Sequence, residues 1–178
     1  WEAQKDNDLK RLAFILATAK RESSGTWQPI REAPRCSTET CREQAIGKML
    51  QKRAEAKGKK PRANYASPAA NGQRYYGRGY IQLTGEENYK QADQRLRTGT
   101  KLYDNPDKVM ERKIAITILV RGMLEGWFGS RKPLSTYLNE TKADWINARN
   151  NVNPGSPNKL ITAASAREIN ACLKPMEN

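Results

Sequence analysis

The sequence predicts a mainly helical protein in which only one short segment is expected to be extended. Around Ile81 and Leu83, apolar and polar residues alternate, which indicates a short extended piece. The chain has 178 residues, enough for one domain with a substantial core. Apolar residues recur at helical spacing in residues 9–19, 109–127 and 160–173. We therefore expect one mainly α domain over residues 1–178, with at most a minor β element.

The first helix is expected to begin at Leu9, where Asn7 or Asp8 can cap it. The sequence Ser-Ser-Gly at residues 23–25 should end it. Glu22 then lies near the C-terminal end of this helix, where the helix dipole disfavours a negative charge. A carboxyl group in that position could keep its proton near neutral pH, as a general acid requires.

A second carboxylate follows in the next loop. Pro29 and Pro34 favour irregular structure there, and Glu32 lies between them. If this loop returned over the helix end, it would hold Glu22 and Glu32 across a cleft. Paired carboxylates are the usual apparatus of glycoside cleavage. The alternative is that each is a surface glutamate paired with its neighbouring arginine.

Residues 75–89 contain two glycines, Gly77 and Gly79, that flank an arginine. This pattern indicates a tight turn or a close approach of the backbone. Neutral hydrogen-bonding groups beside aromatic rings would suit a sugar, although the segment could equally be a polar loop whose glycines only serve turns. The side chains expected to project together here, from the extended piece and the start of the next helix, are Gln82, Thr84, Asn88 and Tyr89.

The absence of histidine limits the possible chemistry. It excludes Ser-His-Asp and Cys-His arrangements, so catalysis should depend on carboxylates. Three cysteines without histidine are too few for a usual structural zinc site. Cys36 and Cys41 are close enough in sequence to form a disulfide in an oxidising compartment, whereas Cys172 is far away.

Two of these segments resemble the family 19 glycoside hydrolases, the chitinases and their phage-endolysin relatives. Residues 77–89, Gly-Arg-Gly-Tyr-Ile-Gln-Leu-Thr-Gly-Glu-Glu-Asn-Tyr, resemble the central motif of the family. Residues 17–27 resemble the segment in which a helix ends in His-Glu-Ser/Thr-Gly-Gly and carries the catalytic acid, so Glu22 takes the place of that acid. Arg21 stands where the histidine is usual, and Ser24 where the first glycine is usual.

Further segments resemble the same family in the same order. Arg31 and Glu32 are similar to an Arg-Glu pair that carries the second glutamate in the endolysin branch, with one more residue between the glutamates here. Residues 144–155 resemble an Ala-Arg-x-x-[Ile/Val]-Asn-Gly segment, which implies that Arg149 and Asn153 face a cleft. Residues 122–129 resemble a helix end of the endolysins. Glu125 in that stretch is a third carboxylate, for which we expect a surface role.

The resemblance implies a lysozyme-like domain with two lobes around a central cleft. It implies hydrolysis of β-1,4 linkages between N-acetylhexosamines by an inverting mechanism. Glu22 would be the general acid, and Glu32 the general base on a water that Thr84 helps to position. The residues implied to hold the sugars are Gln82, Asn88, Tyr89, Arg149 and Asn153. No metal and no organic cofactor are implied.

The formal net charge of +13 bears on the substrate. It favours an anionic bacterial wall over neutral chitin, although such a surface could also give only solubility and non-specific adhesion. We therefore predict a peptidoglycan hydrolase of the muramidase type, with chitinase as the alternative. An alternative of another class is a non-catalytic cationic domain that binds wall polymer or nucleic acid. Nucleic acid is not expected, because the basic run Lys57–Lys60 contains no aromatic residue.

The predicted biological setting follows from the same reading. We expect a monomer that acts as a phage endolysin or as a secreted antibacterial effector, in the bacterial periplasm or cell wall. An effector would have an immunity protein as a partner. The sequence begins with Trp1 and is expected to be a piece of a longer protein. It has no apolar run of the roughly 18 residues that a membrane span needs.

Overall fold

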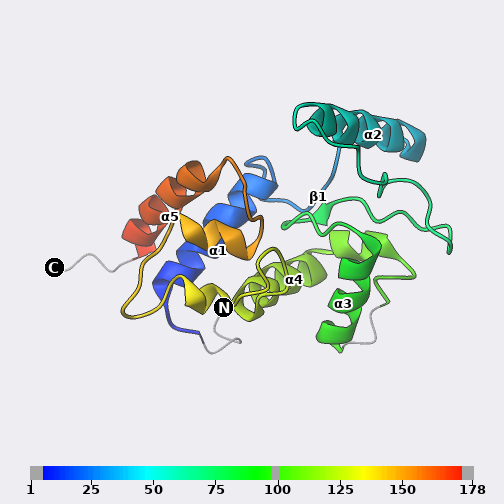
Figure 1. The fold of residues 1–178 in the computed structure, drawn as a ribbon. Helices are drawn as coiled ribbons and strands as arrows, with labels where there is room; N and C mark the ends of the chain where they lie inside the picture. Colours follow the sequence, from blue (N-terminus) through cyan, green and yellow to red (C-terminus); the bar gives the residue numbers. More distant parts are fainter. Residues whose placement is uncertain (1–5, 98–100, 174–178) are drawn as a thin grey trace. The chain divides into compact units, whose positions relative to one another are not determined.

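The computed structural model describes residues 6–97 and 101–173 and is mainly helical, which confirms the predicted class (Figure 1). The α-helices are α1 (Leu9–Glu22), α2 (Glu39–Glu55), α3 (Glu86–Leu96), α4 (Arg112–Glu125) and α5 (Lys159–Leu173). Short 3-10 helices cover Pro106–Met110, Leu134–Thr136 and Asn147–Asn151. Strands β1 (Ile30–Arg31) and β2 (Arg78–Gly79) pair antiparallel. No helix in the described ranges has the length and apolar character that a membrane crossing requires.

The chain divides into two compact units. The first contains Trp1–Trp27 and Ala115–Asn178, and the second contains Gln28–Ile114. The predicted two lobes with a central cleft, joined in a single domain, stay a prediction. Every site residue named from the sequence belongs to one unit or the other.

In the first unit, α1 and α5 lie side by side (Figure 1). Helix α1 begins at Leu9 as predicted, and the Asp8 carboxylate caps it by accepting a hydrogen bond of 2.8 Å from the Lys10 N–H. The buried faces of both helices carry small residues, which include Ala17 on α1 and Ala163 on α5. Small side chains allow two helices to approach closely, and this pair holds the end of α1 in place.

The second unit has a small core between α2 and the chain that leads into β2. Ile46 of α2 packs with Ala66 and Tyr76, and Met49 and Leu50 pack against them. The disulfide between Cys36 and Cys41 is present, as expected, with the two Cα atoms 5.5 Å apart. It joins the first turn of α2 to the loop that carries Glu32.

The segment predicted as extended is a tight hairpin instead. Arg78 and Leu83 exchange backbone hydrogen bonds of 2.9 and 3.2 Å, and residues 80–82 form the turn between them. Gln82 has a φ of +54°, a conformation that alternation of residue types does not reveal. The predicted alternation of faces still holds, because Ile81 and Leu83 are buried whereas Gln82 and Thr84 are partly exposed. The expected extended backbone was wrong, but the expected division into buried and exposed side chains was correct.

Arg78, the residue between the two glycines, is a buried cation at the centre of the second unit. Its guanidinium lies 3.6 Å from the centre of the Tyr76 ring. It donates to the backbone oxygens of Arg74 and Tyr76 and to the Tyr89 hydroxyl, and it forms an ion pair of 2.8 Å with Asp107. Partial burial would raise the pKa of the Asp107 carboxyl, but hydrogen bonds from Arg31 and Arg78 outweigh that effect and hold this pKa below its ordinary value.

We predict that Arg78→Met lowers the free energy of unfolding by about 3 kcal/mol, because it leaves several buried acceptors unpaired. Arg31→Met is the matched control. Arg31 pairs with the same Asp107 at 3.0 Å, but its side chain is 38 % exposed. Its removal should cost about 1 kcal/mol or less. Urea denaturation followed by circular dichroism measures both, and equal losses for the two variants would contradict this account.

Candidate active site

Three polar side chains of the second unit converge on Gly77. A Cβ atom placed on Gly77 would lie 2.8 Å from Gln82 Oε1, 3.1 Å from Glu32 Oε2 and 3.1 Å from Thr84 Oγ1. All three oxygens therefore lie within about one hydrogen-bond length of a single point. The expectation of a close approach at the first glycine is confirmed, since no side chain fits there without moving one of these groups. Gly79 has the other property expected of this pair, a positive φ of +82°, at the end of β2 where the tight turn begins.

The Glu32 carboxylate is held by two donors. Its Oε1 accepts a hydrogen bond of 2.7 Å from the Tyr65 hydroxyl, and its Oε2 accepts one of 2.9 Å from the Gly77 N–H. Its own backbone N–H donates to the Gly77 oxygen at 2.7 Å. Burial raises the pKa of the Tyr65 hydroxyl, and the nearby Glu32 carboxylate raises it further, so Tyr65 stays a donor. Tyr65 was not identified from the sequence, where it lies in a loop without a motif.

Gln82 and Thr84 offer acceptors at this point. The Gln82 amide nitrogen donates to the backbone oxygens of Ile30 and Gly79, at 2.9 and 3.1 Å, so its oxygen faces Gly77. The Thr84 hydroxyl donates its proton to the Gln82 backbone oxygen at 2.7 Å. A hydroxyl has only one proton, so Thr84 can only accept from a further group at the site. The site thus combines a carboxylate with two oriented neutral acceptors.

The two residues predicted at the start of α3 have different environments. Asn88 is partly exposed, and its amide donates to the Thr84 backbone oxygen at 2.7 Å. Tyr89 is fully buried, and its hydroxyl donates to the Tyr76 backbone oxygen at 3.0 Å. Its ring and hydroxyl are therefore packed inside the unit in this structure, and the expectation that Tyr89 holds a sugar stays a prediction. Tyr89 belongs to the core that surrounds Arg78. Its place in the sequence motif did not indicate the direction in which its ring points.

Glu22 is the last residue of α1, as predicted, and its side chain is 20 % exposed. The helix ends in a Schellman motif. The Gly25 N–H donates to the Lys20 oxygen at 2.8 Å, and the Ser24 N–H donates to the Arg21 oxygen at 3.3 Å. Ser24 occupies the left-handed position of this motif with a φ of +54°. This geometry fixes the direction in which the chain leaves Glu22.

Arg149 contacts Glu22 directly within the first unit. Its Nη2 donates to Glu22 Oε1, and the side chain is only 3 % exposed. Arg149 Nε and Nη1 are buried and have no hydrogen-bond partner among the described residues. The expectation that Arg149 faces a cleft and holds a sugar stays a prediction. Its observed contact is with the predicted acid.

The remaining candidates of the first unit lie near the surface. Asn153 is exposed, and its N–H donates to the Arg149 oxygen at 2.9 Å. Glu125 is exposed, accepts from Arg121 at 2.8 Å and accepts from the Trp127 indole at 2.9 Å, in keeping with its expected surface role. The predicted pairing of Glu22 with Glu32 joins one residue from each unit and stays a prediction.

Comparison with known proteins identifies the family. The family described as "Chitinase class I", the family 19 glycoside hydrolases, matches residues 3–155 of this chain. The chain belongs to the family 19 glycoside hydrolases. It is also similar to a tomato (Solanum lycopersicum) protein described as "Acidic 26 kDa endochitinase", with 56% identity over 36 residues. That alignment covers 20% of this chain and 14% of the tomato protein.

Family membership confirms the resemblance from which the glycosidase prediction was made. It also gives a functional context for the Gly77 cluster, since the predicted base Glu32 and its neighbours Gln82 and Thr84 meet in one place. The individual catalytic and binding roles stay predictions. Two contacts could not have been found from sequence spacing, namely Tyr65 with Glu32 and Arg149 with Glu22.

We predict that Gly77→Ala reduces glycosidase activity about 100-fold while the protein stays folded, because the added methyl group displaces the flexible ends of Gln82 and Glu32. Gly47→Ala is the matched control. A Cβ there would also approach a flexible side chain, Asn64 at 3.1 Å, but within α2. Steady-state rates and thermal unfolding of both variants test this. Full activity of Gly77→Ala would contradict it.

We predict that Tyr65→Phe lowers kcat about tenfold with little change in KM. The variant removes one of the two donors that orient the Glu32 carboxylate and adds no volume. Tyr103→Phe, which removes a hydroxyl that donates to Glu86 at 3.3 Å, is the control and should leave kcat unchanged. A purely structural role for Tyr65 would instead lower the melting temperature and leave kcat unaltered.

Proposed function

We propose that the chain is a peptidoglycan hydrolase of the muramidase type that cleaves β-1,4 bonds between N-acetylhexosamines. The observation that supports this most strongly is the convergence of Glu32, Gln82 and Thr84 on one point beside Gly77. A water bound against these three oxygens, farther from the Gly77 backbone than that point, would donate one proton to the Glu32 carboxylate and the other to Thr84 or Gln82. Its lone pair would then be free to attack a sugar carbon.

In the proposed mechanism Glu32 is the general base and Glu22 is the general acid. Glu32 takes a proton from the water as the water oxygen forms a bond to the anomeric carbon. Glu22 gives its proton to the leaving glycosidic oxygen as that carbon–oxygen bond breaks. The water attacks from the face opposite the leaving group, so the configuration inverts. Arg149 positions Glu22 through the contact with Oε1.

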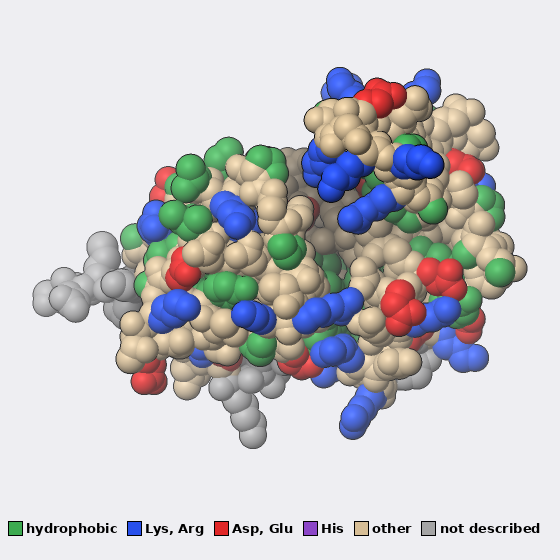
Figure 2. Space-filling model, in the orientation of Figure 1, with side chains coloured by type: hydrophobic (Ala, Val, Ile, Leu, Met, Phe, Trp, Pro, Cys, Tyr) green, Lys and Arg blue, Asp and Glu red, His purple; other side chains and the backbone are tan. Residues whose placement is uncertain are grey.

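The preference for peptidoglycan is supported by the charge of the chain. There are 32 Lys and Arg residues against 19 Asp and Glu residues. Figure 2 shows Lys and Arg side chains spread over the visible surface, with fewer acidic side chains among them. Such a surface raises the local concentration of an anionic polymer. We place the proposed enzyme in the bacterial periplasm or cell wall, as an endolysin or as an effector with an immunity partner.

Chitin is the second candidate substrate. It is favoured by the similarity to the tomato protein, whose description is that of an endochitinase. The two polymers share the β-1,4 linkage between N-acetylhexosamines, so the same carboxylates would serve both. The alternatives differ in what the sugars carry, which is a lactyl-peptide in peptidoglycan and nothing further in chitin.

We predict that the purified chain releases disaccharide-peptides from peptidoglycan faster than it releases oligomers from chitin. Glu22→Gln and Glu32→Gln should each lower the rate about 100- to 10,000-fold, because each removes a proton-transfer group. Product masses after borohydride reduction identify the bond, since a muramidase leaves a reducible muramic acid end. Proton NMR of fresh chitooligosaccharide products reports the anomer, and α-product from a β-bond supports inversion.

Glu125→Gln is the matched control for these variants. Glu125 is a surface glutamate paired with Arg121, and the same change there should leave the rate unaltered. If Glu32→Gln stays active, Glu32 is not the base. If the wild type releases products from chitin alone, the muramidase proposal fails and chitinase replaces it. If it releases nothing from either polymer, a binding function is the better account.

A further inference from the structure

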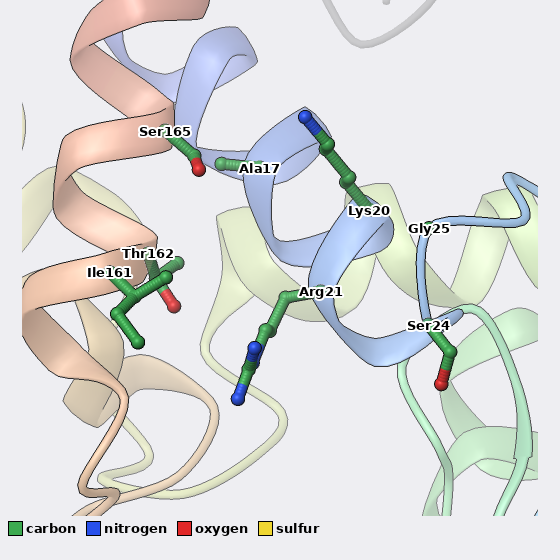
Figure 3. A pocket seen from close by; sticks show the side chains of 8 residues that line it. All are labelled: Ala17, Lys20, Arg21, Ser24, Gly25, Ile161, Thr162 and Ser165. Atoms are coloured by element: carbon green, nitrogen blue, oxygen red, sulfur yellow. The ribbon is translucent and has the colours of Figure 1, made fainter.

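A hollow of about 530 Å³ lies within the first unit, between the C-terminal end of α1 and the first turns of α5 (Figure 3). This volume falls in the range of sites that hold small molecules or peptide segments. It adjoins the turn that carries Glu22, but Glu22 does not line it. The residues that line it are Ala17, Lys20, Arg21, Ser24, Gly25, Ile161, Thr162 and Ser165.

The hollow contains positive charge that no described residue neutralises. Lys20 and Arg21 are exposed, and neither forms an ion pair with any described residue. In Figure 3 the two side chains leave α1 in different directions, and Arg21 extends toward the side where Ile161 and Thr162 lie. Two separated cations on one wall are suited to a ligand with carboxylate groups.

The helix end does not need these cations for capping. The Ala19, Lys20 and Arg21 oxygens already accept backbone hydrogen bonds from Ser23, Gly25 and Ser24. Basic residues in a last turn do favour the helix dipole, by about 0.3 to 1 kcal/mol each. The helix dipole explains why Lys20 and Arg21 carry positive charge. It explains neither the hollow nor the hydroxyl groups beside it.

Ser24 is a further indication of a ligand. It stands at the left-handed position of the Schellman motif, which glycine adopts with less strain. The strained residue brings a hydroxyl to the hollow, and Ser165 of α5 brings another. The Thr162 hydroxyl, in contrast, already donates to the Asn158 oxygen at 3.0 Å. Ser24 and Ser165 therefore supply the neutral polar groups of the hollow.

The α5 side of the hollow also presents one large apolar side chain. Ile161 is 56% exposed although it is a large aliphatic residue, and it lines the hollow (Figure 3). An apolar surface together with cations and hydroxyls fits a short peptide that carries both methyl groups and carboxylates. It does not fit a neutral sugar chain, which would leave the cations without a partner.

We propose that this hollow binds the acidic peptide that peptidoglycan carries next to the bond to be cleaved. The proposal rests on the proposed muramidase function and names the feature that would select peptidoglycan over chitin. Arg21 and Ser24 precede and follow Glu22 by one and two residues. A peptide held by them is attached to a sugar close to the predicted acid. Arg21 pairs with a peptide carboxylate, Ser24 and Ser165 bond its amides, and Ile161 packs on its methyl groups.

The test compares two forms of one substrate. Soluble glycan strands with their peptides and the same strands stripped by an amidase are each cleaved by the wild type, Arg21→Gln and Ser165→Leu. We expect the wild type to cleave the peptide-bearing strands with a higher kcat/KM than the stripped strands. The ratio of these two kcat/KM values should fall about tenfold in each variant. Any effect of Arg21 on neighbouring Glu22 acts on both substrates equally, so the ratio isolates the peptide contact.

Arg167→Gln is the matched control, because Arg167 is an exposed arginine of α5 that does not line the hollow. It removes the same charge and should keep the wild-type ratio. The proposal is overturned if the wild type shows no preference, or if Arg21→Gln and Ser165→Leu keep it. A loss of preference in Arg167→Gln as large as in Arg21→Gln also overturns it, since net charge would then be the cause.

A binding measurement separates this proposal from the proposed function. The tripeptide L-Ala-D-iGlu-L-Lys is titrated into ¹⁵N-labelled protein. We expect amide shifts at Ser24, Ile161 and Ser165 that are absent in Arg21→Gln. If no strand is cleaved but these shifts occur, the muramidase function fails while the peptide site stands. If strands are cleaved and the shifts do not occur, the peptide site fails while the function stands.

Discussion

The second unit depends on the reciprocal contact between Glu32 and Gly77. Glu32 donates its backbone N–H to the Gly77 oxygen, and the Gly77 N–H donates to the Glu32 carboxylate. The contact extends the pairing of β1 with β2 by one residue and requires the absence of a side chain at residue 77. Arg78, the next residue, anchors the hairpin in the core through Tyr76 and Asp107. The backbone pairing of Glu32 with Gly77 and the burial of Arg78 thus both fix the position of the predicted base.

Much of the fold could be predicted because its signals are local. The Asp8 cap, the end of α1 at Ser-Ser-Gly and the disulfide between Cys36 and Cys41 each depend on residues close together in sequence. The helix expected over 109–127 is shorter, because Glu111 is extended between the 3-10 helix at Pro106–Met110 and α4. Alternation of residue types predicted which side chains of 81–84 are buried, but not that the backbone turns at Gln82.

The site was predicted less completely because its geometry comes from long-range contacts. Tyr65 reaches Glu32 from 33 residues away, and Arg149 reaches Glu22 from 127 residues away. Neither contact leaves a spacing pattern in the sequence. Tyr89 shows the opposite difficulty. It lies within a family motif, yet its ring is core, because a motif can preserve packing around Arg78 as well as contact with substrate.

The Cys36–Cys41 disulfide makes the shape of the predicted base loop depend on where the chain is located. The bond begins four residues after Glu32 and fixes that loop to the first turn of α2, where Arg42 also binds the Glu32 and Cys36 backbone oxygens. Closing so short a loop contributes about 2 kcal/mol in the chain-entropy account. In a reducing cytosol this link is absent. A chain of this design would therefore reach its full rigidity only in an oxidising compartment.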